Sequence, residues 1–436
     1  MLNDSPGLQN GSTRSARKNL RTLVQVAKER SSWYKKRLAD VDPETLTEAD
    51  LDRIPPMTKA DLMDHWDQIV TDRRLTLDRV NTHLESLTTD QYLFDEYHAV
   101  ASGGSTGRRG VFVYDWAAWL FLHVMKARWA FRELKSNPER TKRPPIRAQI
   151  AAERATHKTS AMSQTFSDSL AKVHRFPITL PIQQIVDGLN KVQPTWLGGY
   201  PSALYLLSHE ARAGRLRISP SLVNTAAEPL LPEIRAALED TWDVQVRNVW
   251  GCSEGASAVS CGEGQGMHLN DDFCLVEPVD VEGTPVPAGT ASAKIYLTNL
   301  YNHALPLIRY EVTDEITILG EPCPCGSAYR RIDDIMGRLD DTFMYASGIQ
   351  VHPHLFRTAL GGNRNILEYQ VQQTPQGAKI SIRCTSEVDV SKLHSKIAKG
   401  LIALGLEDPD LSIVPVDHFE RLDTGKLKRF IPLAPV

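Results

Sequence analysis

Hydrophobic and polar positions along this chain follow two different periodicities, one typical of helices and one typical of strands. Apolar residues recur at helical spacing among lysines and arginines between residues 14 and 38, and an apolar run at 116–134 predicts a second helix. Short alternating runs rich in β-branched residues, such as Val111–Tyr114, predict strands. Two Thr-x-x-Asp patterns, which start at Thr47 and Thr58, predict helix starts.

In the middle of the chain, predicted strands and helices alternate. Helices are expected to begin near Pro201 and Pro232, each after a short apolar run and a turn of small residues. This alternation predicts a parallel sheet, with ligands bound at the carboxyl ends of its strands. The segment 153–168 is rich in Ser, Thr and His, and we interpret it as a loop near a site or as disordered surface. The predicted strands are residues 148–152, 194–199, 222–226 and 244–250.

The pattern changes again toward the C-terminus. Short strands are predicted at 280–284, 293–298 and 307–311. Beyond residue 341 the order of elements predicts a compact α+β module. Its expected strands are 366–372, 379–384 and 411–416, and its expected helix is 388–404.

Composition excludes several classes of function. The 436 residues carry a net charge of −3, which gives no electrostatic reason to expect a nucleic-acid partner. No apolar run approaches the roughly 20 residues that span a bilayer, and the first residues lack the apolar core of a signal peptide. We therefore expect a cytoplasmic protein without a membrane partner. Six cysteines are too few for a disulfide scaffold in a chain of this length.

Candidate chemistry first gathers in a glycine-rich loop between two predicted strands. Glycines let a backbone approach a polyanion with its N–H groups exposed, while hydroxyls and arginines add donors and charge. The loop lacks the Gly-Lys-Ser/Thr ending of a Walker loop, and it joins two strands instead of a strand and a helix. It suits a pyrophosphate leaving group, although a flexible surface turn would have the same composition. Its residues are Ser102, Gly103, Gly104, Ser105, Thr106, Gly107, Arg108, Arg109 and Gly110.

Further motifs follow this loop in a fixed order. They are Ala226–Pro229, Trp250–Glu254, Leu297–Asp314, Gly337–Asp341 and Thr424–Lys426. Together with the glycine loop they resemble the adenylate-forming superfamily of acyl-CoA synthetases, adenylation domains and luciferases. Within it, the chain resembles the branch of phenylacetate–CoA ligase and capsule-synthesis proteins. The resemblance runs from about Ile54 to the C-terminus.

The resemblance implies an α/β fold with two domains. The large N-terminal adenylation domain, residues 1–337, would contain parallel sheets, helices and a β-subdomain. The small α+β C-terminal domain, residues 342–436, would be mobile about a hinge at 338–341, with Asp340 as the pivot. Rotation of this domain would exchange the lysine loop for another face between two half-reactions.

The resemblance also implies a role for each motif in the activation of a carboxylic acid by ATP. Lys426 would neutralise the carboxylate and the α-phosphate, and Glu254 would hold Mg²⁺. Arg338 would reach the nucleotide, and Asp314 would hold the ribose hydroxyls. The remaining nucleotide contacts would come from the glycine loop and from Ala227, Glu228, Pro229, Trp250, Gly251 and Ser253. The chain departs from the family pattern at Arg109, where a lysine is usual, and at Ala226 and Thr313, where glycine is usual.

The motifs define the identity of the acid substrate and of the acyl acceptor less closely than they define the nucleotide contacts. By resemblance, the acyl pocket is lined by Tyr200, Pro201, Ser202, Ala226 and Gly251, with Trp129 or residues near Ala151 on its upstream wall. These side chains favour an aryl or arylacetic acid, and a medium acyl chain would also fit. CoA is the expected acceptor, while an amine or a carrier protein is the alternative. A remote alternative is a relative that binds nucleotide without catalysing a reaction. A homodimer is a possible oligomeric state.

A cysteine pair predicts a structural metal site. Cys323 and Cys325 lie at a turn before a glycine, where two thiolates can share a soft metal. Upstream, Cys261 and His268 are separated by a glycine-rich loop and would complete a Cys₃His set for zinc. Members of the branch have a comparable set. The alternative is a pair of reduced surface thiols and an unrelated histidine.

Overall fold

The chain folds into two compact units, each made of segments that are distant in sequence. In a computed structural model, the first unit comprises residues 1–145, 153–173 and 247–334, and the second comprises 146–152, 174–246 and 335–436. The described residues are 9–87, 89–102, 109–136, 145–151, 156–166, 173–335, 337–338, 341–346, 348–361, 363, 365–422 and 427–433. Within these ranges, no helix is long and apolar enough to cross a membrane.

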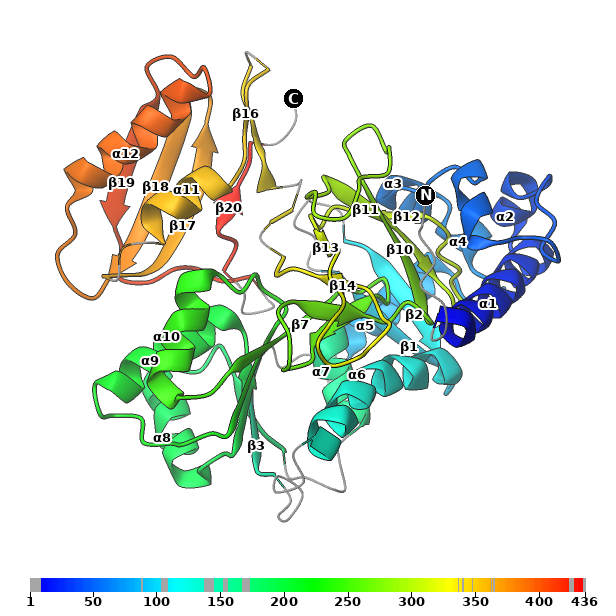
Figure 1. Cartoon of the computed structure of the whole chain (residues 1–436), viewed down its shortest axis with the longest axis horizontal. Helices are drawn as coiled ribbons and strands as arrows, with labels where there is room; N and C mark the ends of the chain where they lie inside the picture. The colour runs from blue at the N-terminus through cyan, green and yellow to red at the C-terminus, as the bar shows by residue number, and fades with distance from the viewer. Residues whose placement is uncertain are drawn as a thin grey trace. The chain divides into compact units, whose positions relative to one another are not determined.

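Helices and antiparallel sheets build the first unit (Figure 1). Its helices are α1 (Gln9–Arg30), α2 (Ser32–Arg37), the 3₁₀ helix η1 (Glu48–Arg53), α3 (Lys59–Asp64), α4 (Trp66–Ile69), α5 (Leu77–Ser86), α6 (Trp116–Ser136) and α7 (Lys158–Thr165). Its strands are β1 (Tyr97–Ala101), β2 (Val111–Asp115), β7 (Val246–Gly251), β8 (Ser257–Ser260), β9 (Met267–Leu269), β10 (Cys274–Val279), β11 (Lys294–Asn299), β12 (Tyr310–Val312), β13 (Ile318–Leu319) and β14 (Arg331–Ile332). The antiparallel ladders run β1–β2, β10–β11–β12 and β13–β14–β9–β8–β7.

Local hydrogen bonds decide where the N-terminal helices begin. Both predicted capping boxes are present. In the second, the Thr58 backbone N–H donates to the Asp61 carboxylate at 2.8 Å, and the Asp61 N–H donates to the Thr58 hydroxyl at 3.1 Å. The helix predicted over 14–38 is divided at Ser31, whose hydroxyl accepts from the Tyr34 N–H at 3.2 Å. This N-cap separates α1 from α2.

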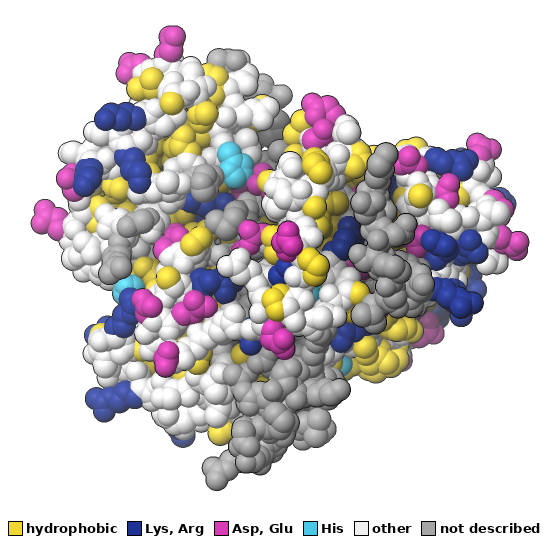
Figure 2. All heavy atoms as spheres, in the orientation of Figure 1, with side chains coloured by type: hydrophobic (Ala, Val, Ile, Leu, Met, Phe, Trp, Pro, Cys, Tyr) yellow, Lys and Arg dark blue, Asp and Glu magenta, His cyan; other side chains and the backbone are white. Residues whose placement is uncertain are grey.

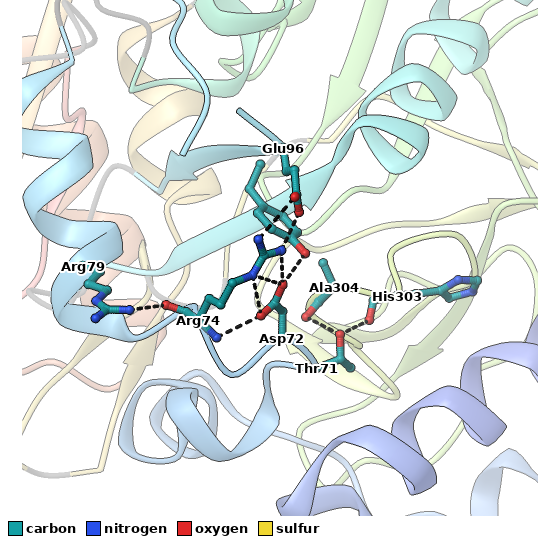
Figure 3. A network of polar contacts seen from close by, with 8 residues as sticks. Thr71, Asp72, Arg74, Arg79, Glu96, His303 and Ala304 are labelled. Carbon is teal, nitrogen blue, oxygen red and sulfur yellow. Dashed lines mark hydrogen bonds and ion pairs between the residues drawn. The ribbon is translucent and has the colours of Figure 1, made fainter. Parts of the chain in front are cut away.

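A polar network joins the segment after α4 to a distant loop of the same unit (Figure 3). The Thr71 hydroxyl donates to the His303 carbonyl at 2.8 Å. The Arg74 guanidinium lies between the carboxylates of Asp72, at 2.6 Å, and Glu96, at 2.5 Å. Hydrogen bonding from Arg74 lowers the pKa of Asp72 to about 2. Because Arg74 and Glu96 are half exposed, this network fixes geometry more than it adds stability.

Helix α6 carries apolar side chains on an exposed face. Trp116, Leu120, Phe121 and Val124 are each at least 40% exposed. They recur at helical spacing, and Figure 2 shows hydrophobic side chains gathered over α6. Since large exposed apolar patches often mark interaction sites, this face is the natural one for testing self-association.

The N-terminal part of the second unit is a parallel layer with helices on one face (Figure 1). The strands lie in the order β6–β5–β3–β4. The pairs β3–β5 and β5–β6 are parallel, as the alternation of strands and helices predicted. Buried leucines such as Leu189, Leu204 and Leu238 fill the space between helices and sheet. The elements are β3 (Arg147–Ala151), β4 (Val173–Pro177), α8 (Ile182–Val192), β5 (Trp196–Gly199), α9 (Pro201–Arg212), β6 (Leu222–Ala226) and α10 (Pro232–Trp242).

The C-terminal part of the second unit is the predicted α+β module. Its sheet has the order β19–β18–β17–β20, with α11 and α12 side by side. On β17, Glu368 is buried and forms ion pairs with Arg383, at 2.9 Å, and with Arg421. The elements are β15 (Phe343–Met344), β16 (Gln350–Val351), α11 (His354–Leu360), β17 (Ile366–Thr374), β18 (Gly377–Cys384), α12 (Val390–Ala403), β19 (Asp410–Pro415) and β20 (Phe430–Ile431).

Two predictions of local structure are wrong. The segment 153–168 contains α7, whose Ala161 and Met162 are buried although its Ser and Thr content suggested a loop. Tertiary burial overrides composition there. Residues 280–284 form a turn after β10 instead of a strand, because the Asp280 carboxylate accepts from the Thr284 N–H at 2.8 Å.

Candidate active site

The neck of the glycine loop is closed by two hydrogen bonds. The Ser102 N–H donates to the Gly110 carbonyl at 2.9 Å, and the Gly110 N–H donates to the Ser102 hydroxyl at 2.8 Å. These bonds continue the β1–β2 hairpin, which confirms the prediction of a loop between two strands. Arg109 is exposed beside the neck. The predicted phosphate-binding residues Gly103, Gly104, Ser105, Thr106 and Gly107 lie outside the described residues.

The turn after β7 contains Glu254, the predicted Mg²⁺ ligand. Each backbone carbonyl group of this turn accepts a hydrogen bond from a side chain. Four side chains from three parts of the first unit donate to the four successive carbonyl oxygens of residues 252–255. The donors are Lys158 to Cys252, Tyr114 to Ser253 (2.5 Å), Asn299 to Glu254 (2.9 Å) and Tyr301 to Gly255 (2.8 Å). Because buried carbonyl groups are costly to leave unpaired, these bonds fix the turn and with it the backbone of Glu254.

Gly255 is required at the end of this turn. Its φ of +111° lies in the region that L side chains rarely adopt. A Cβ atom there would lie 2.2 Å from the Asn299 amide nitrogen and 2.5 Å from the Tyr301 hydroxyl. A side chain at this position would therefore displace two of the four donors.

Two predicted nucleotide-binding residues contact each other. The indole N–H of Trp250, on β7, donates to the Asp314 carboxylate at 2.7 Å, and both side chains are buried. A hydrogen bond to a carboxylate is stronger than one to a neutral acceptor. This bond contributes to holding the Asp314 carboxylate in one orientation. Glu254 lies four residues beyond Trp250, on the adjoining turn.

The predicted acyl-pocket residues of the second unit gather at the carboxyl ends of two parallel strands. Tyr200, Pro201 and Ser202 follow β5, where the Ser202 N–H donates to the Glu228 carboxylate at 3.1 Å. Ala226 is the last residue of β6, and Ala227, Glu228 and Pro229 follow it, with Ala227 at a left-handed φ of +69°. The structure thus brings these two motifs together at one sheet edge, as the predicted parallel topology requires.

The remaining predicted residues fall elsewhere. Arg338 is exposed and belongs to the second unit, whereas Glu254 and Asp314 belong to the first. Lys426 and Asp340, predicted as the catalytic lysine and the hinge, lie outside the described residues, and the side chain of Trp129 is likewise not described. Their roles stay predictions.

The four predicted zinc ligands come together in the first unit. The ligand atoms of Cys261, His268, Cys323 and Cys325 all lie within 4.8 Å of one another. The sulfurs of Cys261 and Cys323 are 3.5 Å apart, and the Cys325 sulfur is 3.4 Å from the His268 Nε2. The His268 Nδ1 is 3.2 Å from the Tyr329 carbonyl, an arrangement that leaves Nε2 for a metal.

Protonation in this cluster also suits a cation. Burial raises the pKa of Cys261, but hydrogen bonds from His268 and from the backbone of residues 263 and 264 bring it down to about 6. Burial and the neighbouring thiols raise the pKa of Cys323 to about 12. Three thiolates cannot all form side by side without a compensating cation, and a divalent ion would supply it. The close approach also needs glycine, because a Cβ at Gly264 would lie 2.9 Å from the Cys323 sulfur.

Sequence reasoning missed the donors around Glu254. Tyr114, Asn299 and Tyr301 occupy ordinary strand or strand-end positions, and nothing in their spacing marks them. Lys158 lies in the segment 153–168, for which the composition predicted a loop or disordered surface, and its position at the first residue of α7 is known only from the structure.

The chain is similar in sequence to two known proteins. It is 27% identical over 241 residues to a phenylacetate-coenzyme A ligase of Thermus thermophilus, a match that covers 53% of this chain and only about half (52%) of that relative. It is 20% identical over 363 residues to the protein CapK of Staphylococcus aureus, covering 81% of this chain and 73% of the relative. No protein-family profile matches the chain.

Solved structures agree on the fold. A 2-hydroxyisobutyryl-CoA ligase in complex with 2-HIB-AMP superposes with a TM-score of 0.74 over 99% of this chain and 94% of the other, at 18% identity. The sequence relatives and this fold confirm the predicted α/β architecture and the predicted resemblance to the phenylacetate–CoA ligase branch of the adenylate-forming superfamily.

Proposed function

We propose that this chain, a relative of phenylacetate–CoA ligase with the fold of the adenylate-forming enzymes, activates a carboxylic acid with ATP and transfers the acyl group to CoA. The observation that carries the proposal is the pairing of Trp250 with Asp314 beside the fully held turn of Glu254. Two motifs that the resemblance assigns to ATP, 250–254 and 297–314, are thereby joined by hydrogen bonds. A silent relative would not need the carbonyl groups of this turn to be fixed so completely.

Two transfers make up the proposed reaction. A carboxylate oxygen of the acid attacks the α-phosphorus of ATP, the bond from that phosphorus to the bridging oxygen breaks, and pyrophosphate leaves. The CoA sulfur then attacks the acyl carbon, its proton goes to solvent, and AMP leaves with the former carboxylate oxygen. The first transfer needs no general base, because the acid is already ionised at pH 7.

The residues of the chain serve this chemistry by placing charge. Asp314 would hold the ribose hydroxyls, and Glu254 would hold a Mg²⁺ ion, which neutralises phosphate charge. Residues 103–108, which lie between the two ends of the neck in sequence, would cradle the phosphates. Lys426 would neutralise the carboxylate and the α-phosphate. An aryl or arylacetic acid is the proposed substrate class.

We also propose that Cys261, His268, Cys323 and Cys325 hold a structural zinc ion. The set has the donor types and the number of ligands of a closed tetrahedral site, with no position left for a reacting water. The ion would fix the loop before β9 to the loop before β14. Arg331 already bridges these loops by donating to the carbonyls of Gln265, at 2.8 Å, and Glu321, at 2.6 Å.

The first experiment measures pyrophosphate release from ATP and Mg²⁺ with phenylacetate, benzoate and hexanoate, with hydroxylamine as a general acyl trap. We expect release with at least one acid, and AMP formation that accelerates when CoA is added. Release without a response to CoA, but with a response to an amine, would favour an amide synthetase. Absence of pyrophosphate release with every acid, while ATP still binds, would contradict the proposal.

The cytoplasmic location and the homodimer stay predictions.

A further inference from the structure

Helix α9 begins without a capping side chain from its own N-terminus. A helix leaves the N–H groups of its first turn without partners inside the helix, and the preceding side chain usually accepts one of them. Tyr200 holds this N-cap position, and its side chain makes no capping bond to the described first turn. Pro201 follows and has no N–H, so the first donor of the helix is the Ser202 N–H. This N–H donates to the carboxylate of Glu228, 26 positions away, at 3.1 Å.

Glu228 thus takes the place of the missing cap. A carboxylate at the N-terminal end of a helix is stabilised by the helix dipole and by a charge-assisted hydrogen bond. The bond involves only the backbone of Ser202, whose buried hydroxyl has no hydrogen-bond partner among the described residues. It joins the end of β5 to the end of β6, which are neighbouring parallel strands. Two motifs that are distant in sequence are thereby fixed to each other within the second unit.

The backbone next to Glu228 depends on such a restraint. Ala227 has a φ of +69°, in the region that L residues rarely adopt. A conformation of this kind persists where neighbouring contacts hold it. The bond from Ser202 to Glu228 is such a contact, one residue along the chain. Its loss would let the turn 226–229 relax and would release the first turn of α9 from it.

The Glu228 carboxylate is placed for this role and not for contact with a ligand. One oxygen, Oε2, accepts the Ser202 N–H. The other oxygen, Oε1, is buried and has no hydrogen-bond partner among the described residues. A covered oxygen cannot be reached by a nucleotide. The resemblance counts Glu228 among the nucleotide contacts, but this geometry assigns its carboxylate to α9.

We infer that Glu228 is a positioning residue that couples the two substrates of the proposed reaction. It acts through the Ser202 N–H. One end of this bond fixes the turn 226–229, which the resemblance assigns to the nucleotide, and the other end fixes residues 200–202, which the resemblance assigns to the acid. The inference rests on the proposed function, because it takes both assignments from it. Since one bond orients both motifs, its loss should weaken the use of the acid and of ATP together.

The test compares Glu228→Met, which removes the acceptor at similar volume, with Glu228→Gln, which keeps an acceptor oxygen at the same reach. Steady-state pyrophosphate release is measured with ATP, Mg²⁺ and whichever of phenylacetate, benzoate and hexanoate supports it. In Glu228→Met we expect the KM for the acid and the KM for ATP each to rise about 10-fold, with kcat changed less than about threefold. Both KM values should return most of the way in Glu228→Gln.

Asp389→Ala is the matched control, because it removes another carboxylate cap. The Asp389 side chain accepts the Lys392 N–H at 2.9 Å at the start of α12, in the C-terminal part of the second unit. This variant should lower the Tm about as much as Glu228→Met does, with both KM values unchanged.

A rise in the KM for ATP alone in Glu228→Met would overturn the inference and return Glu228 to direct nucleotide contact. A lower Tm with both KM values unchanged would also overturn it and leave Glu228 as a cap of α9 only. If Glu228→Met does not fold, Glu228→Asp takes its place, because it keeps the charge but shortens the side chain by one methylene, and the same rise in both KM values is expected. Absence of release in the unaltered protein refutes the proposed function, whereas release with unchanged KM values in these variants refutes the inference alone.

Discussion

Replacement of Trp250 by Phe isolates one hydrogen bond of the candidate active site. The indole N–H donates to the buried Asp314 carboxylate at 2.7 Å, and Phe keeps most of the ring but lacks the donor. A hydrogen bond to a charged group contributes about 1.5–3 kcal/mol, and its loss leaves the carboxylate without a partner on that side. If Asp314 holds the ribose, about 2 kcal/mol of positioning is lost, which corresponds to roughly 30-fold in kcat/KM for ATP.

Steady-state pyrophosphate release and thermal unfolding test this expectation together. Trp119→Phe is the matched control, because Trp119 is also buried in the first unit and its indole N–H donates to the neutral hydroxyl of Thr165 at 2.9 Å. Both variants should lower the Tm by a few degrees, about 1 kcal/mol or more. Only Trp250→Phe should weaken the use of ATP. Equal kcat/KM values for ATP in the two variants would refute the placement of Asp314 at the nucleotide.

The other predictions concern the metal cluster and two buried titratable groups. The double variant Cys323→Ser, Cys325→Ser should lose zinc and unfold at a lower temperature, whereas Cys384→Ser should keep the zinc and the Tm. Elemental analysis that finds no zinc in the unaltered protein would contradict the metal site. Burial lowers the pKa of His98 to about 3, below its usual value of about 6.5, so the folded state binds fewer protons in that window. Stability should therefore fall as pH drops from about 6.5 toward 3, and the slope of Tm against pH should be shallower in His98→Phe; an identical slope would reject this account. Glu368→Gln leaves two partly buried arginines without their carboxylate and should cost about 3 kcal/mol in urea unfolding, while a loss below about 1 kcal/mol would show that solvent already compensates them.

Local structure could be predicted from the sequence wherever a short pattern of residues determines it. The capping box at Thr58 requires only two side chains three residues apart. The hairpin closed by Ser102 and Gly110 requires only two strands joined by a glycine-rich loop. The parallel layer also followed from its pattern, because a strand that returns in the same direction requires a crossover helix. The zinc ligands were predicted from residue type, and the fold then brought all four within 4.8 Å.

What the sequence could not supply were contacts between residues whose spacing carries no pattern. Tyr114 and Asn299 are 185 positions apart, yet they donate to adjacent carbonyls of one turn. The segment that contains Lys158 was interpreted as a loop or disordered surface because its Ser and Thr content gives no apolar pattern, although α7 buries Lys158, Ser160, Ala161 and Met162. Motifs therefore determined which residues are candidates for the chemistry. Only tertiary packing decided which donors fix Glu254 and which cation lies beside it, because these depend on where distant strands and helices meet.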